Sequence, residues 1–131
     1  MQQLPPYPDA EAVVMAMLAG IAPTVTATPA DISTPLIRVQ RVGGSDDRVT
    51  DYPRIEVCVF YPVAQDGDTA AAWAMAEQCR QTILAARCTV VAGALCDNAT
   101  TATPPQLLPW DNPNLRRIAA TFVLAFRRPR V

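Results

Sequence analysis

The chain has 131 residues, half of them apolar, and a formal net charge of −1. This length suits one domain, and the apolar content excludes an intrinsically disordered chain. The near-neutral charge gives no overall field for nucleic acid or an acidic membrane. The chain has no histidine, and all 11 positive charges are arginine, which excludes Ser–His, Cys–His and lysine-based catalysis.

The N-terminal segment predicts an arm followed by a helix. Prolines within residues 1–8 exclude a helix there, so we expect an extended arm. Asp9 can cap the helix that follows. Its apolar face, which ends near Gly20, consists of Ala10, Val13, Val14, Met17, Leu18 and Ile21. Residues 22–35 are rich in Thr, Pro and Ala and predict a connector.

Two strands are predicted next, in the segments LIRVQRV (36–42) and RIEVCVFY (54–61). Both segments alternate between two sets of side chains, as strands with one buried face do. About ten residues, 43–53, join them, which is longer than the usual hairpin loop. We therefore expect this loop to protrude or to have a role.

The predicted loop carries Asp46, Asp47 and Asp51, which suit either a carboxylate site or a turn. The spacing lacks the EF-hand pattern, and the two glycines do not form a phosphate-binding loop. Aspartates can instead bond their own backbone, and Arg48 and Arg54 can pair with Asp51 or with another chain. We favour the structural reading, with a small metal-dependent enzyme using the three aspartates as the alternative.

A second helix is predicted from a cap at Asp68 or Thr69 to about Arg87. Its core stripe consists of Ala72, Met75, Ala76, Cys79, Ile83 and Ala86. The residues beside the stripe are Trp73, Arg80, Leu84 and Arg87. Their composition fits an interface and equally fits a wide apolar face on a buried helix.

The C-terminal third predicts short strands, a loop and one long strand. Residues 88–96 (CTVVAGALC) predict one strand or two short ones, and the proline-rich residues 98–113 predict a loop. The last strand is LRRIAATFVLAFR, residues 115–127. Five arginines and no acid follow Asp111: Arg116, Arg117, Arg127, Arg128 and Arg130. Aromatic residues do not interleave with them for base stacking, so we favour a solvated or subunit-facing row over nucleic-acid binding.

The cysteines predict thiols rather than a metal site. Cys58, Cys79, Cys88 and Cys96 contain no CxxC pair, so we expect free thiols in a reducing compartment. A Cys88–Cys96 bridge across a turn remains the alternative. The sequence shows no secretion signal and no apolar run long enough for a membrane span.

The order of these elements predicts an α/β (α+β) two-layer domain over residues 9–131. We expect a mostly antiparallel sheet of about four strands, with both helices packed on one face. The opposite face faces water or a neighbouring subunit in this arrangement. It carries Arg38, Gln40, Glu56, Arg117, Thr121 and Arg127.

Two sequence blocks carry a resemblance to a known family. The first is IRVQRVGGSDDRVTDYPRIEVCVFYP followed by AAAWAMAEQCRQTIL, and the second is LPWDNPNLRRIAATFVLAFR. In this order and spacing they resemble the tail terminator (tail-completion) proteins of long-tailed, siphophage-type bacteriophages. The resemblance covers residues from about 36 to 128, and the N-terminal helix fits in position only.

This resemblance implies a structural protein of the virion with no enzymatic activity and no cofactor. It implies a hexameric ring at the tail–neck junction, assembled in the host cytoplasm, that caps the tail tube and ends its polymerisation. The implied partners are other copies, the tail tube protein and the head-closure or connector protein. DNA would pass through the lumen without sequence-specific binding, and no membrane is involved.

Two further alternatives stay open beside the enzyme, namely another neck ring such as the head-closure (stopper) protein, and a monomeric binding module. A heterologous ring contact joins two different patches of the same chain, and charged groups set its register. We therefore expect charged and aromatic residues at the subunit or ring interface. The candidates are Arg38, Arg41, Asp46, Asp47, Arg48, Asp51, Arg54, Trp73, Arg80, Leu84, Arg87, Trp110, Arg116, Arg117 and Arg127.

Overall fold

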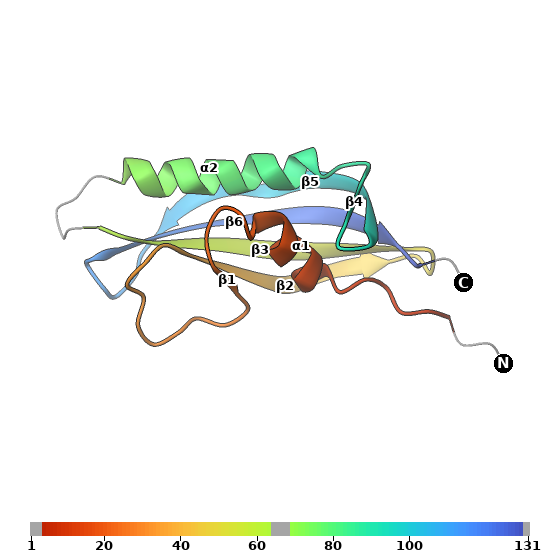
Figure 1. Cartoon of the computed structure of the whole chain (residues 1–131), viewed down its shortest axis with the longest axis horizontal. Helices are drawn as coiled ribbons and strands as arrows, with labels where there is room; N and C mark the ends of the chain where they lie inside the picture. The colour runs from red at the N-terminus through yellow and green to blue at the C-terminus, as the bar shows by residue number, and fades with distance from the viewer. Residues whose placement is uncertain (1–3, 64–68, 130–131) are drawn as a thin grey trace.

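A computed structural model of the chain describes residues 4–63 and 69–129 (Figure 1). Its elements are α1 (Ala10–Leu18), β1 (Thr24–Val25), β2 (Leu36–Asp46), β3 (Thr50–Pro62), α2 (Ala70–Ala85), β4 (Thr89–Val91), β5 (Ala94–Leu108) and β6 (Leu115–Arg127). In this part of the chain the strands form one six-stranded sheet in the order β1-β2-β3-β6-β5-β4. Every pairing is antiparallel except that of β1 with β2.

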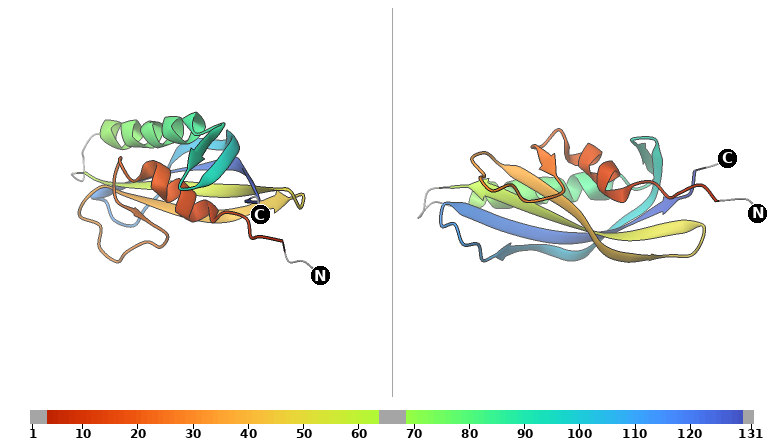
Figure 2. Two further views of the ribbon diagram at one scale, coloured as in Figure 1. Left: turned by 45° about the vertical axis from the view of Figure 1, so that its right-hand side comes forward. Right: turned by 90° about the horizontal axis from the view of Figure 1, so that it is seen from below.

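Both helices cover the same face of the sheet, as predicted (Figures 1 and 2). Asp9 caps α1 by accepting a hydrogen bond from the N–H of Ala12 at 3.2 Å. Strand side chains such as Ile118 and Phe122 pack beneath the helices, each 1% exposed. Burying a side chain of this size stabilises the fold by about 1.5–3 kcal/mol. This apolar layer is the main core.

Helix α2 presents its predicted apolar stripe to that core. The stripe is buried throughout: Ala72, Met75, Ala76, Cys79, Ile83 and Ala86. The helix begins after Thr69, whose side chain makes no capping hydrogen bond. The alternative cap, Asp68, lies outside the described residues. The predicted helix is therefore confirmed over the part that the structure describes.

The sheet has six strands rather than about four, because a short strand forms in the predicted connector and residues 88–96 give two strands, β4 and the start of β5. Within the predicted connector, β1 pairs with the start of β2. The proline-rich segment predicted as a loop instead continues β5 as far as Leu108. Register shifts between Thr101 and Gln106 carry the strand past Pro104 and Pro105. Prolines are tolerated there because β5 is an outer strand over this stretch.

The predicted ten-residue loop between β2 and β3 is wrong. Strand pairing continues to Asp46, which lies opposite Asp51, and the N–H of Asp47 donates to the carbonyl of Thr50 at 3.1 Å. Only residues 47–49 form the tip of the hairpin. The charged segment is thus the end of two long paired strands.

The glycines in this hairpin serve close packing rather than a loop. Gly44 has a φ of +125°, and a Cβ atom there would collide with the carbonyl oxygen of Tyr52 on the paired strand. A bulge between Arg41 and Gly43 shifts the register just before it. Glycine inside a strand often marks such a close backbone approach.

The face of the sheet away from the helices, here called the far face, is covered over only part of its area. A second apolar cluster lies there, formed by Leu36, Cys58, Phe60 and Ala119. Ile32 of the connector and Leu108 pack against it. The expectation of an open polar face is therefore wrong for this half. The other half, near Arg54 and Thr100, is exposed.

Candidate interaction surfaces

The hairpin carries a buried ion pair. Asp51 is 3% exposed and accepts two hydrogen bonds from the Arg41 guanidinium, at 2.7 and 2.8 Å. These bonds raise the pKa of Arg41, above all through the side-chain hydrogen bond to Asp51. The partner is thus Arg41, rather than Arg48 or Arg54 as expected. Two-bond arginine–carboxylate pairs are among the strongest polar contacts, so Asp51 supports the fold.

Asp47 stabilises the tip of the hairpin. Its carboxylate accepts hydrogen bonds from the N–H groups of Val49 at 3.1 Å and Thr50 at 2.8 Å, and from the Tyr52 hydroxyl at 3.3 Å. The bonds from Thr50, and then Val49, lower the pKa of Asp47. Asp46 accepts a long bond, 3.4 Å, from the N–H of Arg48. Of the three aspartates, Asp46 therefore has the weakest hydrogen bonding to the rest of the chain.

Arg128 joins three segments at the same end of the molecule. Its Nε donates to the carbonyl of Arg48 at 2.8 Å, and its Nη1 donates to the carbonyl of Pro5 at 2.6 Å. Its guanidinium also lies 4.0 Å from the centre of the Tyr7 ring. The arm, the hairpin tip and the end of β6 are therefore tied together. In the sequence Arg128 is only one residue of a basic run, and no local pattern predicts that it connects the arm to the hairpin tip.

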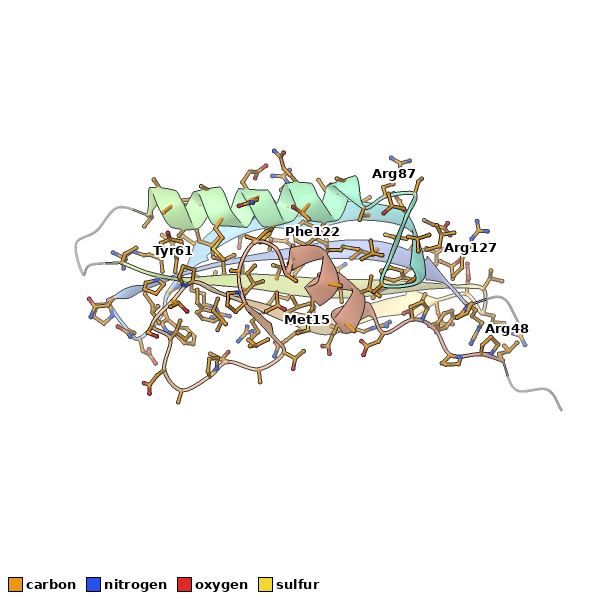
Figure 3. The ribbon with its side chains drawn as sticks, in the orientation of Figure 1. Met15, Arg48, Tyr61, Arg87, Phe122 and Arg127 are labelled. Atoms are coloured by element: carbon orange, nitrogen blue, oxygen red, sulfur yellow. The ribbon has the colours of Figure 1, made fainter. Side chains whose placement is uncertain are left out.

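The other basic residues of this end lie on the surface. Figure 3 shows Arg48, Arg87 and Arg127 at the end of the molecule where β6 finishes. Arg127 pairs with Asp97 at 2.6 Å, although its side chain is 61% exposed. Exposed ion pairs stabilise a fold by about 0–1 kcal/mol. These side chains therefore contribute more to the positive charge of the surface than to the stability of the fold.

The far face holds a row of alternating arginine and aromatic side chains. The guanidinium carbon of Arg38 lies 5.6 Å from the centre of the Phe60 ring. The Phe60 and Trp110 rings meet edge-on, with their centres 5.1 Å apart. The guanidinium carbon of Arg117 lies 5.4 Å from the centre of the Trp110 ring. Cation–π contacts of this kind contribute about 0.5–2 kcal/mol each. Trp110 thus fixes the loop after β5 onto the sheet.

Polar contacts complete this layer. Arg38 donates to Glu56 at 2.8 Å and to Thr28 of the connector at 2.6 Å. Arg117 donates to the Cys58 sulfur at 3.3 Å. Burial raises the pKa of Cys58 even though the Arg117 hydrogen bond lowers it. Arg38 and Arg117 are consequently used within the chain, although both were candidates for contact with another subunit.

The outer surface of α2 and the adjoining loops hold the remaining candidates. Trp73 is 38% exposed, Leu84 is half-buried, and Arg87 is exposed. Arg80 forms a 3.6 Å ion pair with Glu77 one helical turn away. Arg116 donates to the carbonyl of Pro113 at 2.9 Å and is half-buried.

The cysteines are free thiols. Cys58, Cys79 and Cys96 are buried and Cys88 is exposed, with no Cys88–Cys96 bridge. Burial raises the pKa of Cys79 to about 12, so this thiol stays protonated. Within residues 4–63 and 69–129, no three cysteine, aspartate or glutamate side chains gather to hold a metal. Neither α1 nor α2 has the length and apolar character needed to cross a membrane.

Comparisons with known proteins give a family and a related fold. A family described as "Phage tail termination protein" matches residues 6–131. Among solved structures, a chain of "Virion of native gene transfer agent (GTA) particle" is similar, with 16% identity and a TM-score of 0.61. The similarity covers 90% of this chain and 87% of that one. No curated protein matches the sequence.

Proposed function

Since the chain belongs to the phage tail termination protein family, we propose that its copies form a ring that caps the finished tail tube. The chain is a structural protein of the virion tail and not an enzyme. It assembles with other tail components. The observation that carries the proposal is the family match, which extends from residue 6 to the last residue of the chain.

The ring ends polymerisation of the tube by covering its growing end. Its other side joins the head-proximal connector, and DNA passes through its lumen. The resemblance of the sequence to siphophage tail terminators supports six copies. A ring requires two different patches on each copy, one for each neighbour.

The exposed charged residues of the hairpin end are our candidates for contact with a neighbouring copy or an adjoining ring. Asp46, Arg48 and Arg87 are exposed. Asp51, Arg41 and Arg38 take part in ion pairs within the chain. Mixed-sign surfaces set register and partner choice more than affinity. We therefore assign recognition to the first group and support of the fold to the second.

Electron microscopy of the purified chain, and of tails assembled with it, tests the ring. We expect rings, and caps at the end of each tube. Asp46→Arg reverses one exposed charge without removing the three hydrogen bonds at Asp47. It should therefore melt like the wild type and yield fewer rings and tails of irregular length. Asp31→Arg, the same change on the exposed connector, is the matched control.

Normal rings and normal tail length for Asp46→Arg would contradict the role of this residue. Cross-linking in assembled particles identifies the ring's neighbours. Contact with the tail tube protein supports a terminator. Contact with head-side rings alone would instead support a head-closure protein.

A further inference from the structure

Two strands form the outer sides of the sheet over most of its length. On one side, β1 covers only Ile37 and Arg38 of β2. On the other, β4 covers only the first three residues of β5, Ala94 to Cys96. The rest of each outer strand exposes backbone N–H and C=O groups unless something else protects it.

Strand β2 is protected up to its bulge and open beyond it. The carboxylate of Glu11 in α1 accepts a hydrogen bond from the N–H of Arg41 at 2.8 Å. Beyond the bulge, residues 43–46 pair with β3 in constant register, and all are exposed. Because Asp47 bonds to Thr50 across the hairpin, alternation turns the N–H and C=O groups of Gly44 and Asp46 outward. No strand among the described residues lies beyond them.

Strand β5 has an open stretch of the same length. Residues 98–101 pair with β6 without a shift, and register shifts bound them on both sides. Pro104 and Pro105 follow the second shift. Bulges and prolines protect outer strands against pairing, so these features leave residues 98–101 as the unprotected part of β5.

The two open stretches lie at the same level of the sheet. Gly43 pairs with Arg54, Arg54 pairs with Val123, and Val123 pairs with Thr100. One row across four strands therefore joins the two stretches. Three antiparallel steps separate β2 from β5, so the two strands run in opposite directions.

We propose that residues 43–45 of one copy pair, antiparallel, with residues 98–100 of the next copy, with Gly43 opposite Thr100 and Ser45 opposite Asn98, so that the sheet continues around the ring. This inference rests on the proposed ring. Because both stretches lie on one row, successive copies need no shift along the strands, which is the condition for closure rather than a helical filament.

The side chains of the two stretches suit this contact. Gly43, Gly44 and Ser45 add little bulk, so a second backbone can approach closely. Thr100 and Thr101 on the other stretch favour strand geometry. A second copy is the partner that supplies a stretch of matching length, level and direction on each side.

Disulfide cross-linking between copies tests the pairing. Ser45 and Asn98 lie two residues from the shared row, on the same side of it and the same sheet face. In a Cys88→Ser background, mild oxidation of the double variant Ser45→Cys, Asn98→Cys should convert monomer into a ladder of covalent oligomers. The control pairs Ser45→Cys with Gln106→Cys, which is exposed on the same face of β5 but distant along the strand, and should give no covalent oligomers.

Electron microscopy of the same samples separates the outcomes. Rings with the ladder support both the pairing and the ring. Rings without cross-links overturn the pairing and leave the ring intact. A ladder in open chains supports the pairing and overturns the ring. Neither rings nor cross-links, with melting unchanged from the wild type, would overturn both.

Discussion

On the helix face of the sheet, Phe122 lies beneath α2 (Figure 3), and Ile118 belongs to the same cluster of apolar side chains. On the far face, Phe60 is covered by Trp110, and arginines lie beside both rings. The first layer needs only apolar side chains at helical and strand spacing. The second needs particular partners from two loops. The helix face is thus stabilised by non-directional apolar packing, and the far face by directional contacts between particular side chains.

This difference predicts how each face responds to substitution. An apolar layer loses stability in proportion to the volume removed. A layer of directional contacts loses most when one partner of a buried polar pair is removed and the other stays. Substitutions on the two faces therefore test this difference.

The largest effect is expected in the apolar layer. Phe122→Ala should lower the free energy of unfolding by about 3–5 kcal/mol, because it leaves a cavity where the side chain was 1% exposed. Denaturant unfolding followed by circular dichroism measures the change. Phe122→Leu, which keeps most of the volume, should cost clearly less. Equal losses for both would show that the core does not depend on packing.

A smaller loss is expected from the far-face ion pair. Glu56→Ala leaves the Arg38 side chain, 13% exposed, without its carboxylate. We expect a loss of about 2–3 kcal/mol, below the range for fully buried pairs. Glu56→Gln keeps a hydrogen-bond acceptor and serves as the control. A neutral result for Glu56→Ala in thermal unfolding would mean that water replaces the carboxylate.

Next comes the aromatic contact of the far face. Trp110→Ala removes the edge-on contact with Phe60 and the contact with Arg117, and should cost about 1–2 kcal/mol. Trp73→Ala, on the outer surface of α2, is the matched control and should change stability little. Melting temperatures of the two variants provide the comparison. A larger loss for Trp73→Ala would show that the far-face row contributes less than surface packing.

The smallest effect concerns pH at the hairpin tip. The pKa of Asp47 in the folded chain lies below its ordinary value of 3.8. Its carboxylate therefore stabilises the hairpin above pH 3.8, and this contribution is lost as the pH falls through the lowered pKa. The protection factors of the Val49 and Thr50 amides, measured by NMR hydrogen exchange relative to the intrinsic exchange rate at each pH, should fall in that range. Asp47→Asn should flatten this dependence, and an unchanged profile would assign it to another group.

The difference between the two faces also explains which parts of the fold could be predicted from the sequence. Strand β6 matches its predicted bounds, Leu115–Arg127, because its apolar residues alternate without interruption. The stripe of α2 was equally clear from its spacing. Both elements belong to the apolar layer, where periodicity reports burial directly.

The missed features depend on contacts between distant segments. Gly43 and Gly44 suggested a loop, because composition does not distinguish a turn from a close approach of two strands. Pro104 and Pro105 suggested another, although register shifts accommodate both in an outer strand. For the site, the aspartates were identified but not their partners. That Asp51 binds Arg41 follows from strand register, which single-residue patterns do not contain.

The contact between Arg128 and the arm also has a consequence in time. The hydrogen bond from Arg128 to Pro5 spans 123 positions of the chain, whereas the hairpin of β2 and β3 closes over three residues, 47–49. Closing a long loop costs more chain entropy than closing a short one, so contacts between distant segments form slowly. We expect the hairpin to assemble early and the arm to dock last. Asp46 and Arg48, which we assign to recognition, lie on the early-forming hairpin, and the docking of the arm would complete the end of the molecule that carries them.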